Sequence, residues 1–154
     1  TLDEVLTSIG DKKIPRIVVS EYLPGVELTI DTIVNNGALL DCLIRTRTSI
    51  NNGISTAGSF IEDKEIYEYV DKIVSSIPGL EGPIGFQVKK SAKGKYLLLE
   101  SNPRIQGTSV AALGLGVNLP LRAVNQALGV TLERLPRHSG ISFTRYYQEA
   151  FYDS

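Results

Sequence analysis

Residue types that often carry redox or zinc chemistry are scarce in this sequence. The 154 residues contain one cysteine, Cys42, and one histidine, His138, far apart in the chain. A protein zinc site needs three or four such ligands, and a Cys/His nucleophile needs both residues together, so neither is indicated. A single cysteine also cannot form an internal disulfide. We expect Cys42 to be a small buried hydrophobic residue in a protein of the reducing cytoplasm.

Long apolar runs, a strong net charge and methionine are also missing. No apolar run approaches the roughly 20 residues that cross a bilayer, and no signal peptide is visible, so no membrane partner is expected. The formal net charge is −1, and no basic patch favours a nucleic-acid partner. An apolar share of 42% over 154 residues indicates one folded domain with a real core. Because the chain begins at Thr1 and has no methionine, we expect it not to be a complete primary translation product.

The segment 96–104, Tyr-Leu-Leu-Leu-Glu-Ser-Asn-Pro-Arg, is the most informative part of the sequence. Its apolar start predicts a buried strand, which continues into Glu100, Asn102 and Arg104 at two-residue spacing. Positions i, i+2 and i+4 of a strand project from one face. That face therefore presents two oxygen ligands for a hard cation, followed by a guanidinium suited to phosphate or carboxylate. This layout is typical of a magnesium-nucleotide site.

A preceding strand, 85–88, can add a third ligand to this face. If residues 93–94 form a two-residue hairpin loop, Gln87 lies directly opposite Glu100, and a four-residue loop gives the same pairing. Directly opposed residues have Cβ atoms about 4.5–5.5 Å apart, close enough for two side chains to share an ion. The alternative is a surface hairpin with polar cross-strand pairs and no ligand.

These residues resemble the metal-binding strands of the ATP-grasp enzymes, especially the branch similar to the carbamoyl phosphate synthetase large subunit. In that branch, a Glu-x-Asn pair on one strand and a Gln or Asp on its hairpin partner bind magnesium beneath the ATP phosphates. An arginine two residues after the Asn faces the transferred phosphate or the acyl substrate. The resemblance implies the metal ligands Gln87, Glu100 and Asn102, a catalytic role for Arg104, and ATP with Mg²⁺ (or Mn²⁺) as cofactors. Glutamine rather than aspartate at position 87 favours this branch.

A second segment, 17–31, resembles the adenine-binding hinge of the same family, and the two motifs occur in the expected order. A strand backbone can meet the donor and acceptor on the edge of adenine, and Pro24-Gly25 would end the strand there. By resemblance, the nucleotide contacts are Glu21 and the backbone of Tyr22 and Leu23 for the base, and Glu27 for the ribose hydroxyls. The alternative is an ordinary edge strand that ends at a Pro-Gly turn.

Arg45 and Arg47 share one face of a predicted strand, so both could meet anionic oxygens. They lead into the polar stretch 51–59, which we expect to be a glycine-bearing loop. In the family, a similar strand and loop lie beside the phosphates and the acyl acceptor, which implies nucleotide binding by Arg45 and a catalytic role for Arg47. A solvated strand end followed by an ordinary mobile loop is the alternative. By the same resemblance, the stretch 106–109 lies near the acyl substrate.

The coarse pattern predicts an α+β fold, an antiparallel β-sheet with hairpins and flanking helices. By resemblance this is the ATP-grasp C-terminal subdomain. Capping residues and apolar periodicity predict helices over about 2–9, 62–77 and 118–128. Expected strands lie at about 16–22, 26–34, 38–47, 85–88, 96–99 and 141–147, and Asn35-Asn36-Gly37 predicts a tight hairpin turn.

The resemblance covers about residues 15–147, so we expect the whole chain, 1–154, to be the C-terminal portion of an ATP-grasp domain. No glycine-rich phosphate loop precedes the hinge, so the N-terminal substrate domain and the lid are expected to be absent. The family reaction activates a carboxylate as an acyl phosphate, which an amine or ammonia then attacks. The implied partners are those small molecules and the missing N-terminal half, and a homo-oligomer is left open. Two alternatives remain, a non-catalytic nucleotide-binding or assembly module of this fold, and a β-rich scaffold without a ligand.

Overall fold

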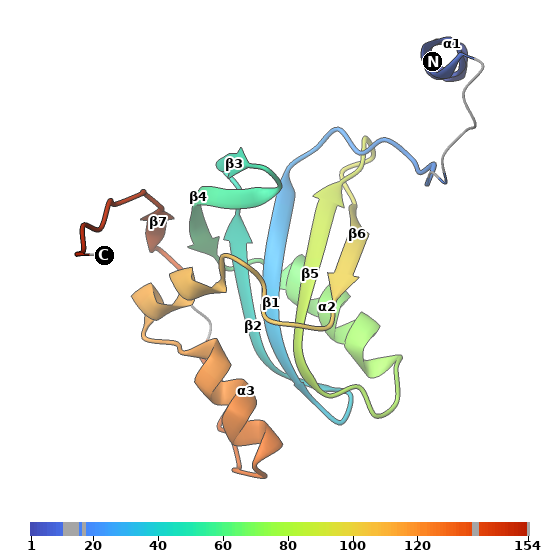
Figure 1. The fold of residues 1–154 in the computed structure, drawn as a ribbon. Helices are drawn as coiled ribbons and strands as arrows, with labels where there is room; N and C mark the ends of the chain where they lie inside the picture. The colour runs from blue at the N-terminus through green and yellow to red at the C-terminus, as the bar shows by residue number, and fades with distance from the viewer. Residues whose placement is uncertain (11–15, 17, 137–138, 154) are drawn as a thin grey trace.

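A single antiparallel sheet forms the centre of the computed structural model, which describes residues 1–10, 16, 18–136 and 139–153 (Figure 1). The strand order is β3–β4–β2–β1–β5–β6, and β7 pairs with β4. The strands are β1 (Glu27–Asn35), β2 (Ala38–Thr46), β3 (Ser49–Asn51), β4 (Ile54–Ile61), β5 (Gly82–Lys90), β6 (Tyr96–Asn102) and β7 (Ser142–Thr144). The predicted α+β architecture of hairpins with flanking helices is confirmed.

The β1–β2 hairpin turns where the sequence predicts it. Asn36 and Gly37 both have positive φ, 49° and 78°, as a two-residue type I′ turn requires. Strand β1 is buried along seven consecutive residues because it pairs with β2 on one side and β5 on the other. Its alternate side chains therefore supply both faces of the sheet.

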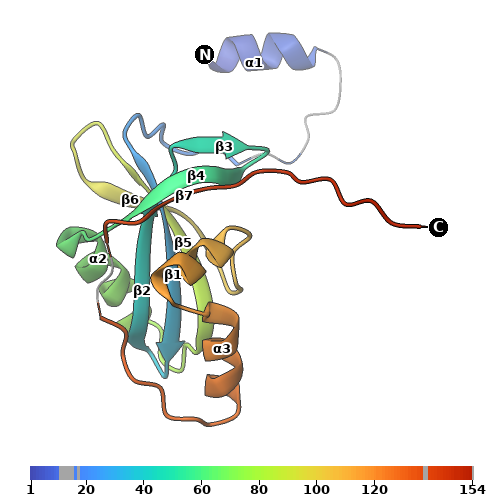
Figure 2. The same ribbon diagram turned by 90° about the vertical axis from the view of Figure 1, so that its left-hand side faces the viewer.

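Helix α2 (Lys64–Ser75) covers one face of the sheet (Figure 2). The Asp63 side chain caps it by accepting a hydrogen bond from the backbone N–H of Ile66 at 3.1 Å. Its fully buried side chains are Ile66, Val70 and Val74. They pack against the alternate apolar residues of β1, β2 and β5 in one core cluster. Ile77, expected on the same stripe, lies beyond the helix end and is exposed.

The opposite face is only half covered. The 3₁₀ segment η1 (Ser109–Leu115) and helix α3 (Leu119–Ala127) pack over its lower part, in the orientation of Figures 1 and 2. Asn118 caps α3 as predicted, accepting from the Leu121 N–H at 3.0 Å, and Arg122 forms an ion pair with Asp41 of β2. The upper part of this face is left for polar residues, and the candidate site lies there.

Two segments differ from the sequence-based expectation. The strand expected over 16–22 is wrong for residues 16 and 18–22, which have no regular structure; Ile17 lies outside the described residues. No neighbouring strand pairs with this segment in the described part of the chain, and an isolated strand leaves its backbone groups without partners. The loop expected over 51–59 is also wrong, because β3 and β4 form a hairpin there. Its turn is Asn52-Gly53, with φ of 48° and 78°, the same signal that identified the β1–β2 turn.

Strand β6 was expected to be buried, and this is wrong. It forms the edge of the sheet, so Leu98 and Leu99 are exposed at 38% and 44%. The Leu98 N–H on this edge donates to the hydroxyl of Tyr69 on α2 at 3.1 Å. Strand β7 is three residues long instead of the expected seven.

Helix α1 (Leu2–Ile9) has the predicted capping box between Thr1 and Glu4, but none of its residues is buried, and it stands apart from the sheet (Figure 1). Cys42 is half-buried against the α2 core cluster rather than fully buried. His138 lies outside the described residues. None of the helices in the described part of the chain has the length and apolar character needed to span a bilayer.

Candidate functional site

Gln87 of β5 lies directly opposite Glu100 of β6, as predicted. The predicted loop is wrong, because three residues, 92–94, form the turn, and Ser91 N–H donates to Lys95 O at 2.8 Å. This loop alone would put Gln87 out of register with Glu100 by one residue. A β-bulge at Leu99 restores the pairing, since Val88 pairs with Leu98 while Gln87 pairs with Glu100.

The three polar residues at the end of β6 contact one another in a row. Asn102 Nδ2 donates to Glu100 Oε1 at 2.8 Å, and Arg104 Nη2 approaches Asn102 Oδ1 at 3.4 Å. Glu100 is exposed, so its carboxylate is open to an ion. Together with Gln87, this end of the hairpin offers one carboxylate and two amide oxygens, which is a donor set that fits Mg²⁺. Among the described residues, no three His, Cys, Asp or Glu side chains gather around a common point, so this set has only one carboxylate.

Arg47 joins two of the predicted ligand residues to the β3–β4 hairpin. Its Nη1 donates to Glu27 Oε1 at 2.6 Å and to Gln87 Oε1 at 2.8 Å. Its Nη2 donates to the backbone oxygen of Gly53 at 2.6 Å. The Arg47 side chain is only 5% exposed, and its Nε, also buried, has no hydrogen-bond partner among the described residues. Glu27, the residue expected to bind the ribose, and Gln87, one of the expected metal ligands, thus both accept hydrogen bonds from the Arg47 guanidinium.

Arg45 forms a buried ion pair with Asp31 of β1, with 2.9 Å between Nε and Oδ2. The other carboxylate oxygen, Asp31 Oδ1, accepts from Gln106 Nε2 at 3.2 Å. Burial raises the pKa of the Asp31 carboxyl above its ordinary value, and Arg45 and Gln106 partly offset that rise. Sequence reasoning missed Asp31, although a carboxylate among the apolar residues 28–34 is a signal that could have identified it.

A short connection, 103–108, crosses the open face of the sheet (Figure 1). Its residues Arg104, Gln106, Gly107 and Thr108 line a small cleft. We call this connection the strap. The cleft has a volume of about 100 Å³. Its lining comprises Thr29, Arg45, Arg47, Gly53, Ile54, Ser55, Gln87, Arg104, Gln106, Gly107 and Thr108. Three arginines and the amide of one implied metal ligand therefore share one cleft, as the sequence predicts for Arg45, Arg47, Arg104 and Gln87.

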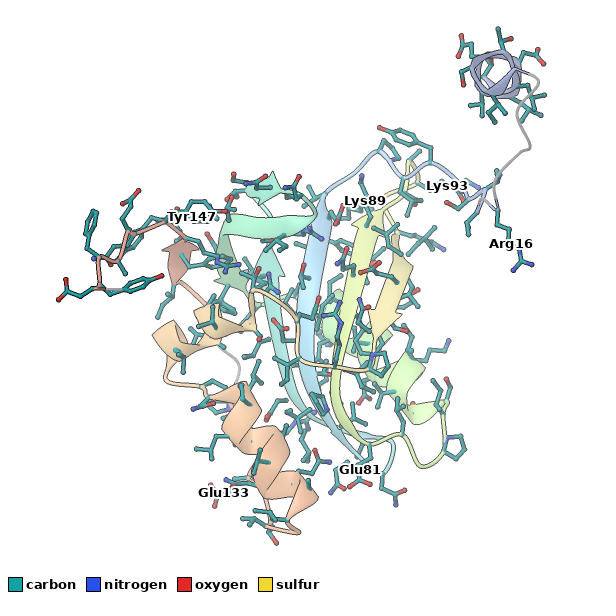
Figure 3. The ribbon with its side chains drawn as sticks, in the orientation of Figure 1. Arg16, Glu81, Lys89, Lys93, Glu133 and Tyr147 are labelled. Atoms are coloured by element: carbon teal, nitrogen blue, oxygen red, sulfur yellow. The ribbon has the colours of Figure 1, made fainter. Side chains whose placement is uncertain are left out.

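The hinge segment reaches the sheet at the end of β5 and does not enter the cleft. Gly25 N–H donates to Lys90 O at 2.9 Å, and Lys90 N–H donates to Val26 O at 3.0 Å. A Cβ at Gly25 would lie 2.4 Å from that of Lys90, so this approach requires glycine. Tyr22 is exposed and Leu23 is buried, and neither residue lines the cleft, nor does Glu21. Figure 3 shows Lys89 and Lys93 at this same end of the hairpin.

A second cavity, of about 260 Å³, adjoins the cleft on the β7 side. Ile54 lines both. The second cavity is lined by Asn51, Asn52, Ile54, Thr56, Arg145, Tyr146 and Tyr147, the last of which is visible in Figure 3. Arg145 is held by its backbone N–H, which donates to Thr56 O at 2.7 Å, and its Nη1 lies 3.4 Å from Gly107 O. Sequence reasoning missed Arg145, because it follows a three-residue strand and belongs to no motif.

Comparison with known structures supports the ATP-grasp fold. An L-amino acid ligase from Bacillus licheniformis is 18% identical with a TM-score of 0.51, over 70% of this chain and 30% of that one. Biotin carboxylase from Campylobacter jejuni, solved with βγ-ATP, is 16% identical with a TM-score of 0.60, over 73% and 27%. The biotin carboxylase domain of a Hydrogenobacter thermophilus 2-oxoglutarate carboxylase, solved with MgADP and bicarbonate, is 20% identical with a TM-score of 0.54, over 77% and 27%. This chain thus spans less than a third of each of these proteins.

A family model gives the more specific result. No curated protein is similar enough to this chain to count as a match. Residues 13–149, however, match the family described as "ATP-grasp in the biosynthetic pathway with Ter operon". That range includes the segment expected to be the hinge, the predicted metal ligands of the β5–β6 hairpin, the strap and Arg145. Since the match extends over most of its length, the chain belongs to this ATP-grasp family.

Proposed function

We propose that this chain supplies the nucleotide hinge and the metal ligands of an ATP- and Mg²⁺-dependent ligase. The reaction joins a small carboxylate to an amine or ammonia through an acyl phosphate, in the manner of the carbamoyl phosphate synthetase-like branch. The observation that carries the proposal is the pairing of Gln87 with Glu100 beside a cleft lined by three arginines. Membership of the ATP-grasp family supports it, as does the similarity in fold to an L-amino acid ligase.

Gln87, Glu100 and Asn102 would hold the divalent ion, Mg²⁺ or Mn²⁺. Their oxygens lie on neighbouring strand positions, and the exposed Glu100 provides the negative charge that favours a hard cation. When bound, the ion neutralises phosphate charge. Phosphoryl transfer depends mainly on such neutralisation and on positioning, rather than on covalent chemistry by the protein.

The arginines would act on the anionic groups of the substrates. Arg104 lies beside the metal ligands and would hold the oxygens of the acyl phosphate, while Arg47 stands between the ribose side and the metal side of the cleft. Arg45 adds positive charge from beneath. A guanidinium suits these roles because it remains charged and presents several donors in one plane.

The base would be bound by the hinge, through Glu21 and the backbone of Tyr22 and Leu23, with Glu27 on the ribose. The chain covers less than a third of the similar structures, so we propose that an N-terminal half completes the module and selects the carboxylate and the amine. A single cysteine and the absence of a disulfide framework support a cytoplasmic site of action. A homo-oligomer is compatible with this proposal.

Isothermal titration of the chain with a non-hydrolysable ATP analogue, with and without Mg²⁺, tests the proposal. We expect weak binding that strengthens with Mg²⁺, and loss of the Mg²⁺ effect in Glu100→Gln. The matched control is Glu68→Gln, an exposed carboxylate on α2 that pairs with Lys64 at the surface. Binding of the analogue that is unaffected by Mg²⁺, or by Glu100→Gln, would overturn the assignment of the metal site.

A further inference from the structure

Asp31, Arg45 and Gln106 form a buried polar cluster at the cleft, and the proposed function gives no role to Asp31 or Gln106. Asp31 is 4% exposed, Arg45 2% and Gln106 7%. The two oxygens of Asp31 divide between the other two residues, Oδ2 accepting from Arg45 Nε and Oδ1 from Gln106 Nε2. One carboxylate therefore connects the strap to an arginine of the cleft.

The strap is seated on the sheet at Gly85. Gln106 Nε2 also donates to the backbone oxygen of Ile30 at 3.0 Å, which places the Gln106 amide against β1, the neighbour of β5. A Cβ at position 85 would lie 2.3 Å from the Gln106 Cδ and Cγ atoms. Since real Cβ contacts are not this short, the Gln106 side chain can occupy this place only because residue 85 is glycine.

A second contact holds the other end of the strap. Thr108 Oγ1 donates to Ser55 O of β4 at 3.1 Å, and Thr108 is 3% exposed. The strap is thus fixed to β1 and β5 by Gln106 and to β4 by Thr108. It spans the cleft between these two points, with Gly107 in the middle.

The Arg104 side chain, by contrast, is held only weakly. Its two hydrogen bonds to described residues go to neighbours in its own segment, Ile105 O at 3.3 Å and Asn102 Oδ1 at 3.4 Å, both near the upper limit for such bonds. Its position over the cleft therefore depends on where the strap lies.

We propose that Gln106 and Asp31 are positioning residues, which seat the strap on Gly85 so that Arg104 and Arg45 face the same anionic group of the nucleotide. This inference rests on the proposed function and adds to it the elements that orient the two arginines. The part of the nucleotide concerned is the terminal phosphate, because the strap lies on the Arg104 side of the cleft and away from the hinge.

The test compares Gly85→Ala and Gln106→Ala with the matched control Gly114→Ala, in η1 and outside the cleft lining. A Cβ at Gly114 would make only an ordinary contact with Ile141 at 3.6 Å, so the control leaves the strap in place. Titration with Mg²⁺-ADP and with Mg²⁺ and β,γ-imido-ATP measures the preference for the terminal phosphate. If two charge-assisted contacts are aligned, wild type and control should prefer the ATP analogue by roughly tenfold. Gly85→Ala and Gln106→Ala should both lose most of that preference, while their ADP affinity stays within about twofold of wild type.

Hydrogen–deuterium exchange of the 103–108 segment supplies the second measurement. Gly85→Ala and Gln106→Ala should exchange faster there than wild type, and Gly114→Ala should not. Faster exchange with an unchanged preference would reduce the cluster to a structural role and overturn the proposal. So would wild-type exchange and preference in both variants, or an equal loss of ADP and ATP-analogue binding. Wild type that binds neither nucleotide with Mg²⁺ would overturn the proposed function itself, and with it this inference.

Discussion

Arg47 donates to Gln87 across the sheet, with 2.8 Å between Nη1 and Oε1. The oxygen assigned to a metal ion is thus already bound by a fixed cation. The same guanidinium holds Glu27 and the β3–β4 hairpin, so under the proposed function metal and nucleotide would be accommodated around one arginine.

Replacing Arg47 should therefore change metal and nucleotide affinity in opposite directions. In Arg47→Leu, the divalent ion alone should bind a few-fold more tightly, because a like charge near the site has been removed. The ATP analogue with Mg²⁺ should bind roughly tenfold more weakly, because the phosphates lose a charged donor. Mn²⁺ titration followed by electron paramagnetic resonance measures the first effect, and calorimetry measures the second. Arg134→Leu, which lies outside the cleft near Tyr67, serves as the control; a change of both affinities in the same direction contradicts this account of Arg47.

The β-bulge at Leu99 should serve the metal site only through the register that it restores. Deleting Leu99 removes the bulged residue and makes the register continuous from the turn, so that Gln87 still faces Glu100 if the turn is kept. The variant should remain folded, because β6 is an edge strand and Leu99 is exposed, and the Mg²⁺ dependence of nucleotide binding should be retained. Circular dichroism and calorimetry check the two parts. Insertion of one alanine between Leu99 and Glu100 should abolish the Mg²⁺ effect, because the inserted residue takes the place opposite Gln87 if the turn and the bulge are kept; loss of the effect in the deletion variant, or its retention in the insertion variant, would mean that the register does not position the metal ligands.

The close approach of Gly25 to Lys90 should be needed for base recognition and little needed for stability. In Gly25→Ala the new methyl group would collide with Lys90, and the hinge must move away from β5. We expect ADP affinity to fall by roughly tenfold, the equivalent of about 1.4 kcal/mol. The melting temperature should fall by only a few degrees, since residues 18, 19 and 22 of the same segment are exposed and Leu23 is its buried residue. Val26→Ala, at an exposed neighbouring position, is the control. A large fall in melting temperature would show that the hinge is part of the folded core.

The Asp31 carboxyl should make a pH-dependent contribution to stability. Burial raises its pKa above the ordinary 3.8, so the folded chain holds this proton more tightly than the unfolded chain does. The stabilisation from the protonated group is fully present below 3.8 and is lost as the pH rises from there through the raised pKa. Urea unfolding of wild type and Asp31→Asn across this window should show wild type losing stability relative to the variant as the pH increases. A difference between the two that is constant with pH, or that grows in favour of wild type, would contradict this.

The parts of the site that sequence reasoning predicted are those formed by neighbouring strands. Gln87 and Glu100 belong to one hairpin, so the alternation of side chains along its strands and the position of its turn were enough to predict that they pair. The turn differs by one residue from the predicted length, and the β-bulge at Leu99 compensates for that difference. The cluster of Asp31, Arg45 and Gln106 joins segments up to 75 residues apart. No local periodicity connects such distant residues, and their contact depends on the strand order β2–β1–β5 and on the space left at Gly85.

The fold shows the same division. Helix α2, helix α3 and the Asn36-Gly37 turn followed from caps, apolar spacing and positive-φ residues, which act within a few positions of the chain. The segment 18–22 has the apolar composition of a strand but lacks a partner strand in the described chain. Composition alone did not reveal the missing neighbour, since a strand depends on pairing as much as on its own residues.

The hinge and the strap are attached to the sheet at separate places, the hinge through Lys90 and the strap through Gln106. No described hydrogen bond joins one to the other. Changes that affect only the base and changes that affect only the terminal phosphate should then contribute independently to the binding free energy. A relative of this protein could thus acquire a different base preference by altering residues 18–26, with its handling of the phosphate left intact.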